Sequence, residues 1–115
     1  MPKKSYIIVR GQFEFCHRYA SAPQEVQYLR NLHRHMFHYE VELEVFHDDR
    51  ELEFIMVKHD IDTYLMDHSV GWDEKTSCEQ MAKYIGAWLQ TKHGFDRDLT
   101  VSIFEDNENG AKVIM

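Results

Sequence analysis

The fold is decided by the stretch His33–His47, which reads HRHMFHYEVELEVFH. Apolar and polar side chains alternate through most of it, and successive side chains of a β-strand point to opposite faces of a sheet. The period of two therefore predicts a strand that buries one face. The residues on the apolar face are Phe37, Tyr39, Val41, Leu43 and Val45.

The segments around this strand extend the pattern. Ser5–His17 alternates in the same way and predicts a first strand. Residues 18–31 contain Pro23 and no strand period, so we expect a long loop with one helical turn at most, and long loops within compact domains usually have a function. After the central strand, residues 48–50 predict a hairpin turn and residues 51–57 predict a third strand.

Helices are predicted in the second half of the chain. Residues 76–79, Thr-Ser-Cys-Glu, have the pattern of a capping box, which marks the start of a helix. Apolar residues then follow at helical spacing and predict a helix from residue 77 to about residue 92. Residues 60–68 have a weaker helical pattern, for which we expect a short helix.

Two closing strands are expected at residues 99–105 and 111–115, joined by the turn-forming residues 107–110, Asn-Glu-Asn-Gly. The predicted order is three strands, a helix and two strands. This order indicates a single α+β domain, residues 1–115, in which an antiparallel sheet has its helices packed on one face.

Composition bounds the function. The net charge of −7 excludes a nucleic-acid surface, which needs clustered Lys and Arg. No apolar stretch approaches the length of a membrane span, and the run Tyr6–Val9 is too short for the core of a signal peptide. Cys16 and Cys78 do not form a disulfide framework of the secreted kind. We therefore expect a cytoplasmic protein with neither a nucleic-acid nor a membrane partner.

Three of the eight histidines have a common placement. His33 and His35 lie on the apolar face of the central strand, with Cα atoms about 6.6 Å apart. His17 ends the first strand on its apolar face. Three imidazoles from the ends of two strands suit zinc, which then keeps a fourth position for water or substrate. The alternative is a set of partly buried histidines whose nitrogens are satisfied by the backbone or by one another.

Four motifs resemble those of the 6-pyruvoyltetrahydropterin synthase and 6-carboxytetrahydropterin synthase family. Residues 13–18 read FEFCHR and residues 32–37 read LHRHMF, similar to the segments that supply the family's zinc ligands. Residues 76–82 read TSCEQMA and are similar to the start of its helix, and residues 101–105 read VSIFE, similar to its late strand. The motifs occur in the family's order and span essentially the whole chain.

This resemblance implies a tunnelling fold (T-fold) and a zinc ion, Zn²⁺, held by three histidines. It implies that Glu105 binds the pterin, through a carboxylate that accepts two hydrogen bonds, and that Asp67 and His68 form a catalytic pair. A surface carboxylate at a strand end and a solvated loop histidine are the ordinary alternatives for Glu105 and His68. The metal ligands that the resemblance implies are His17, His33 and His35.

The activity implied is that of a lyase acting on 7,8-dihydroneopterin triphosphate. The short chain favours the 6-carboxytetrahydropterin synthase branch, which belongs to queuosine biosynthesis. The resemblance further implies a homo-oligomer, a trimeric ring or a homohexamer of two stacked rings, with sites at subunit boundaries.

One departure from the family puts the reaction in doubt. Leu29 lies four residues before the paired histidines, where the family has a catalytic cysteine. Glu25 in the same loop is an alternative base, and Cys78 lies at a predicted helix start, where a thiol pKa can be lowered or the side chain can simply be buried. The alternative function is a zinc- and pterin-binding protein without lyase activity. A cupin-type metalloenzyme is a third hypothesis, but Glu40 lies on the wrong face to join the two histidines.

Overall fold

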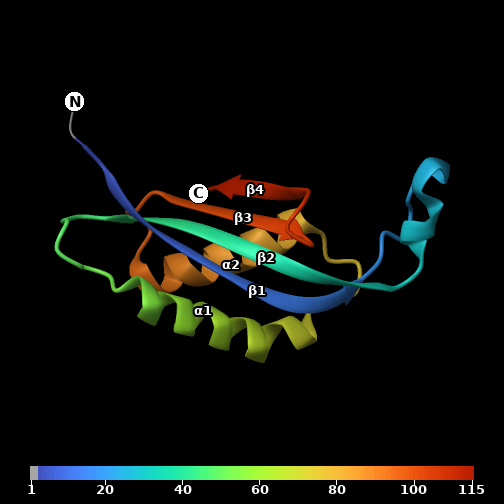
Figure 1. Ribbon diagram of the computed structural model, residues 1–115, viewed down its shortest axis with the longest axis horizontal. Coiled ribbons are helices and arrows are strands. Elements are labelled where there is room, and N and C mark those ends of the chain that lie inside the picture. The colour runs from blue at the N-terminus through green and yellow to red at the C-terminus, as the bar shows by residue number, and fades with distance from the viewer. Residues whose placement is uncertain (1–2) are drawn as a thin grey trace.

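The computed structural model describes residues 3–115 as a four-stranded sheet with helices on one face (Figure 1). The strands follow the order β1-β2-β3-β4 across the sheet, and all neighbours are antiparallel. The predicted α+β class, with an antiparallel sheet and helices on one face, is confirmed. The elements in chain order are β1 (Ser5–His17), the 3-10 helix η1 (Gln24–Arg30), β2 (His33–Val45), α1 (Phe54–His68), the 3-10 helix η2 (Ser69–Gly71), α2 (Cys78–His93), β3 (Leu99–Glu105) and β4 (Gly110–Ile114).

The two long strands pair over their whole length. Their register runs from Ser5 opposite Val45 to His17 opposite His33. A slip of one residue would turn every apolar side chain of a strand to the other face, so burial of one face fixes this register. Both predicted strands are confirmed, the second as far as Val45. The β1–β2 connection, residues 18–32, projects beyond the helices at one end of the molecule (Figure 1).

The third strand predicted at residues 51–57 is wrong, because residues 51–53 are irregular and helix α1 begins at Phe54. Residues Val57, Ile61 and Leu65 recur every four positions and are at most 3% exposed, so they form a buried stripe of a helix. The apparent alternation ends on Phe54 and Met56, which are both exposed. The helix also begins before the short one expected at residues 60–68, and residues 48–50 connect a strand to a helix instead of two strands.

The helix predicted at residues 77–92 is confirmed as α2, with a start one residue later than the capping pattern indicated. Ser77 is the N-cap, and its hydroxyl accepts from the Gln80 N–H while the Gln80 side chain accepts from the Ser77 N–H.

The turn between β3 and β4 also differs from the prediction, which placed it at residues 107–110. Its central residues are Asp106 and Asn107, both in the left-handed region, and Glu108 N–H donates to the Glu105 carbonyl at 2.9 Å.

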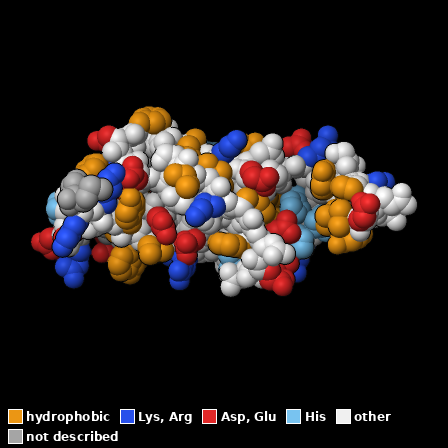
Figure 2. Space-filling view, turned by 90° about the horizontal axis from the view of Figure 1, so that it is seen from above, with side chains coloured by type: hydrophobic (Ala, Val, Ile, Leu, Met, Phe, Trp, Pro, Cys, Tyr) orange, Lys and Arg blue, Asp and Glu red, His pale blue; other side chains and the backbone are white. Residues whose placement is uncertain are grey.

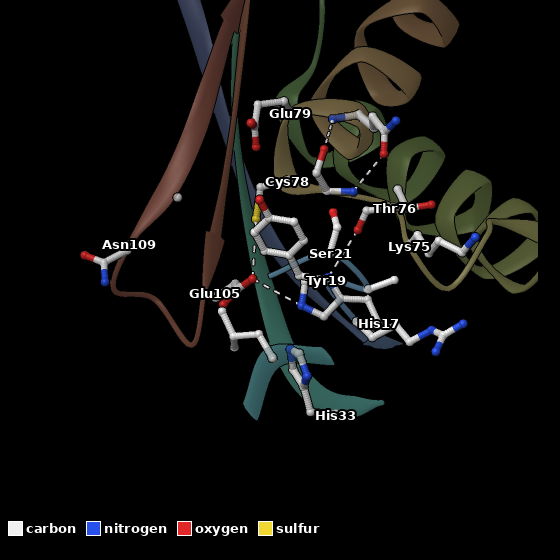
Figure 3. Close-up of a pocket in the computed structure, with 16 residues that line it drawn as sticks. His17, Tyr19, Ser21, His33, Lys75, Thr76, Cys78, Glu79, Glu105 and Asn109 are labelled. Carbon is white, nitrogen blue, oxygen red and sulfur yellow. Dashed lines mark hydrogen bonds and ion pairs between the residues drawn. The ribbon is translucent and has the colours of Figure 1, made fainter. Parts of the chain in front are cut away.

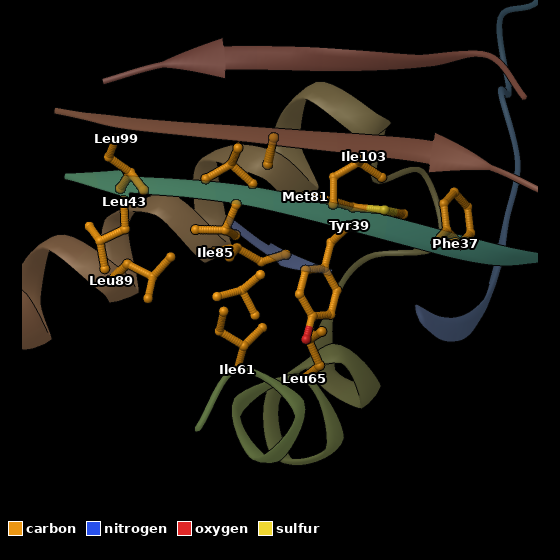
Figure 4. Packing of buried hydrophobic residues seen from close by; sticks show 14 of the residues in the cluster. Phe37, Tyr39, Leu43, Ile61, Leu65, Met81, Ile85, Leu89, Leu99 and Ile103 are labelled. Carbon is orange, nitrogen blue, oxygen red and sulfur yellow. The ribbon is translucent and has the colours of Figure 1, made fainter. Parts of the chain in front are cut away.

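The core lies between the sheet and the two helices (Figure 4). Apolar side chains of β2 and β3 pack against those of α1 and α2, and the Tyr39 hydroxyl reaches Asp62 on α1 at 2.7 Å. Its fully buried large side chains are Phe37, Tyr39, Val41, Leu43, Ile61, Met81, Ile85, Leu89, Leu99, Val101 and Ile103. Among residues 3–115, no helix has the length and apolar character needed to cross a membrane.

Candidate metal centre

Three histidines meet where β1 ends and β2 begins. His17 lies directly opposite His33 in the register, and His35 lies two residues further along β2 on the same face. Their ring centroids are 4.7 Å apart for His17 and His33, 4.8 Å for His33 and His35, and 5.7 Å for His17 and His35. Each ring offers a nitrogen within 4.8 Å of the others, so the three can bind one metal ion. The predicted convergence of these histidines is confirmed.

The Nδ1 atom of each of the three rings contacts an oxygen atom that holds the ring in place. His17 Nδ1 lies 3.1 Å from the Thr76 carbonyl oxygen, His33 Nδ1 lies 2.8 Å from the Asn31 carbonyl oxygen, and His35 Nδ1 lies 2.6 Å from Asp106 Oδ2. Carbonyl and carboxylate oxygens only accept, so each Nδ1 carries the hydrogen of its contact, and a neutral ring in this tautomer keeps its lone pair on Nε2. Histidines that bind metals have the same arrangement, with the second nitrogen donating to an outer acceptor.

The carboxylate of Glu105 faces the ring of His17 (Figure 3) and also lies near the ring of His35. Its oxygens lie 3.2 Å from His17 Nε2 and 3.5 Å from His35 Nε2. Burial lowers the pKa of His17, although the Thr76 carbonyl and Glu105 act in the opposite direction. A neutral His17 has one N–H, which donates to the Thr76 carbonyl. Its Nε2 lone pair then faces the negatively charged carboxylate of Glu105. A cation bound by the three Nε2 atoms removes this repulsion, and a set of imidazole nitrogens suits zinc.

A pocket of about 670 Å³ opens beside the histidines (Figure 3). Its size is within the roughly 300–1,000 Å³ typical of small-molecule sites. The wall includes His17, His33 and Glu105 together with the start of α2 and part of the β1–β2 connection. Histidine side chains also appear in the space-filling view beside the projecting end of the molecule (Figure 2). The site is therefore accessible to a small ligand.

Cys78 lies in the pocket wall as a buried thiol. Burial raises its pKa to about 12, and the nearby carboxylates of Glu105 and Glu79 act in the same direction. Its sulfur lies 3.9 Å from Glu105 Oε1, to which the thiol donates. The position at a helix start does not produce a thiolate here, so the interpretation as a buried helix-start cysteine is the one that the structure supports.

The predicted proton-transfer residues of the same chain, Asp67, His68 and Glu25, do not line this pocket. Asp67 and His68 are exposed at the end of α1, where His68 stacks on Tyr64 with ring centroids 4.6 Å apart. Glu25 is exposed in η1. Leu29 does line the pocket, so its apolar side chain contributes to the wall. The structure therefore brings together His17, His33, His35 and Glu105, and it places the three predicted proton-transfer residues elsewhere.

Asp106 is a site residue that was not predicted from the sequence. Its carboxylate holds His35 and also accepts from the Met36 N–H at 3.2 Å. The hydrogen bond from His35 lowers the pKa of Asp106, which is therefore ionised at neutral pH. The available signal was the Asp-Asn pair directly after a strand, since these residues tolerate the left-handed conformation that tight turns require.

No protein-family model matches the chain, and no curated protein matches it. The function is therefore inferred from the geometry of the pocket together with the motifs described above.

Proposed function

We propose that this protein is a zinc-dependent pterin-processing lyase that acts on 7,8-dihydroneopterin triphosphate, most like 6-carboxytetrahydropterin synthase or 6-pyruvoyltetrahydropterin synthase. The observation that carries the proposal is the shared pocket. Three imidazoles whose Nδ1 atoms contact fixed oxygens lie together near the Glu105 carboxylate, and two of them, His17 and His33, line a cavity of small-molecule size with Glu105.

In this proposal His17, His33 and His35 hold the zinc ion and leave a fourth position for the substrate. When bound, zinc polarises the oxygens of the substrate side chain and makes the neighbouring C–H and O–H bonds more acidic. The three outer acceptors keep the rings oriented, because a ring whose Nδ1 donates to a fixed oxygen cannot turn freely. The metal and substrate positions are then set by rigid strand ends.

Glu105 is the proposed anchor of the pterin ring. Its carboxylate can accept two hydrogen bonds from the 2-amino group and N3–H, a charge-assisted bidentate pair. The side chain is about one-third exposed, and it lies at the end of β3 opposite Phe37. The buried Cys78 thiol beside it is neutral at pH 7, so it adds a weak donor and no competing negative charge.

Proton transfer requires a titratable group within hydrogen-bond reach of the substrate. Asp67, His68 and Glu25 are the candidates from the family resemblance, and none of them lines the pocket of the same chain. We therefore propose that these groups act across a boundary between copies of the chain, in a trimer or homohexamer. This arrangement also gives the exposed β1–β2 connection a partner.

The second candidate function is a zinc- and pterin-binding protein without lyase activity. The observation that favours it is Leu29. This residue lines the pocket at the sequence position where the family that the chain resembles has its catalytic cysteine. A leucine side chain neither attacks nor accepts a proton, so this wall of the pocket contributes only shape. The two candidates share the same metal and pterin contacts and differ in turnover.

The discriminating experiment incubates the zinc-loaded protein with 7,8-dihydroneopterin triphosphate and follows both triphosphate release and the pterin product. Losing a positioned base typically costs about 10²–10⁴ in rate, so we expect slow turnover that increases in Leu29→Cys. Leu32→Cys is the matched control, since Leu32 is exposed and outside the pocket lining.

Loss of turnover in His68→Ala but not in Glu25→Gln supports the Asp67–His68 pair, and the reverse result supports the loop glutamate. Pterin binding without triphosphate release in the wild type and in Leu29→Cys supports the second candidate. Absence of both binding and turnover contradicts both functions.

A further inference from the structure

The turn between β3 and β4 contacts the metal centre as well as the pocket. Glu105 ends β3, and Asp106 and Asn107 follow with φ values of 50° and 59°. Left-handed φ values are costly for most residues, but Asp and Asn tolerate them. The conformation of this turn is therefore specified locally, and it directs two adjacent carboxylates toward the histidine cluster, Glu105 to His17 and His35 and Asp106 to His35.

Asp106 extends the contact between β3 and β2 past the last residue pair of their ladder. Its N–H donates to the Met36 carbonyl at 2.8 Å, and its Oδ1 accepts from the Met36 N–H at 3.2 Å. Its other oxygen, Oδ2, lies 2.6 Å from His35 Nδ1. Three contacts to two consecutive residues of β2 fix both the backbone and the carboxylate of Asp106.

The three histidines differ in what holds them. His17 and His33 are held by main-chain carbonyl groups, of Thr76 and Asn31, whereas His35 is held by a side chain. A carboxylate is a stronger acceptor than a carbonyl, and it makes the opposite nitrogen of the ring a more basic ligand. His35 is therefore the ligand whose strength depends on the identity of one other side chain.

We propose that Asp106 is the positioning residue of the metal centre: it holds His35 as the Nδ1–H tautomer and presents Nε2 to the metal. The inference rests on the proposed function, because it requires a metal on His35. Since Glu105 and Asp106 are adjacent, one turn then fixes the metal ligand and the pterin anchor relative to each other. Removing such an outer partner typically weakens metal binding about 10–100-fold.

The test measures zinc affinity of the full chain by competition with a chromogenic chelator at neutral pH. Asp106→Asn keeps a residue that tolerates the left-handed conformation but removes the negative charge. We expect it to bind zinc about 10–100-fold more weakly than the wild type. Glu108→Gln is the matched control, because it removes one charge from an exposed residue of the same turn that has no contact with His35, and we expect its affinity to be unchanged.

A second measurement separates positioning from a loss of folding. Two-bond ¹H–¹⁵N NMR spectra of the metal-free protein report which nitrogen of each imidazole carries the hydrogen. We expect His35 to change its tautomer balance in Asp106→Asn while His17 and His33 keep Nδ1–H.

Equal zinc affinity in Asp106→Asn and the wild type overturns the inference and leaves the proposed function standing. An unchanged His35 tautomer overturns it as well. Failure of the wild type to bind zinc overturns the proposed function and this inference together.

Discussion

Glu105→Gln is the substitution that most directly tests the substrate contact. The amide keeps one acceptor oxygen and presents an NH₂ group to an edge of the pterin that is itself a donor. A hydrogen bond to a charged group contributes about 1.5–3 kcal/mol. Since about 1.4 kcal/mol is a factor of ten in affinity, we expect pterin binding to weaken roughly 10- to 150-fold.

The assay titrates zinc-loaded protein with neopterin and follows the pterin fluorescence. Zinc content is measured on the same samples, because Glu105 also lies within 3.5 Å of the Nε2 atoms of two proposed metal ligands, His17 and His35. Glu108→Gln serves as the control, since it makes the same change of charge three residues further along and outside the pocket lining. Equal neopterin affinity in Glu105→Gln and the wild type, at equal zinc content, would refute the assignment of Glu105 to the pterin.

Two further predictions concern the fold. Ile61→Ala should destabilise the protein by about 2–5 kcal/mol because it empties a fully buried position of α1. Met66→Ala, on the exposed side of α1, should change stability by less than about 0.5 kcal/mol. The free energy of unfolding in urea measures both effects, and equal effects would contradict the packing of α1. Glu51 accepts hydrogen bonds from Arg97 and from the Phe46 N–H, and these contacts lower its pKa to about 2. Its stabilising effect should be complete above about pH 4.5 and lost as the pH falls toward 2. In the metal-free protein, Glu51→Gln should therefore lower the melting temperature relative to the wild type at pH 6, and by less at pH 2. A difference in melting temperature that does not depend on pH would argue against this ion pair.

The strand faces were predictable from the sequence because their period of two is local. It assigned His17, His33 and His35 to one side of the sheet before any strand pairing was known. Of the helix at residues 54–68, only residues 60–68 were predicted to be helical, because Leu52, Phe54 and Met56 imitate a short strand. The helical spacing of Val57, Ile61 and Leu65 prevails, since it buries all three against the sheet.

The remainder of the site depends on contacts between distant parts of the chain. Glu105 joins the histidines because β3 pairs with β2 in the register that sets Phe37 opposite Glu105. Asp106 reaches His35 across 71 positions of sequence, and the Thr76 carbonyl reaches His17 across 59. Main-chain carbonyl groups carry no sequence signal, so no pattern of residue types could have identified the acceptors behind His17 and His33.

The three-histidine metal centre is tested by the zinc content of the protein after dialysis at neutral pH, measured by mass spectrometry of the metal. We expect about one zinc ion per wild-type chain, bound by three imidazoles. His35→Ala should lose most of it, while His59→Ala, which removes an exposed histidine of α1, should retain it. Undiminished zinc in His35→Ala, or equal loss in both variants, would contradict the three-histidine metal centre.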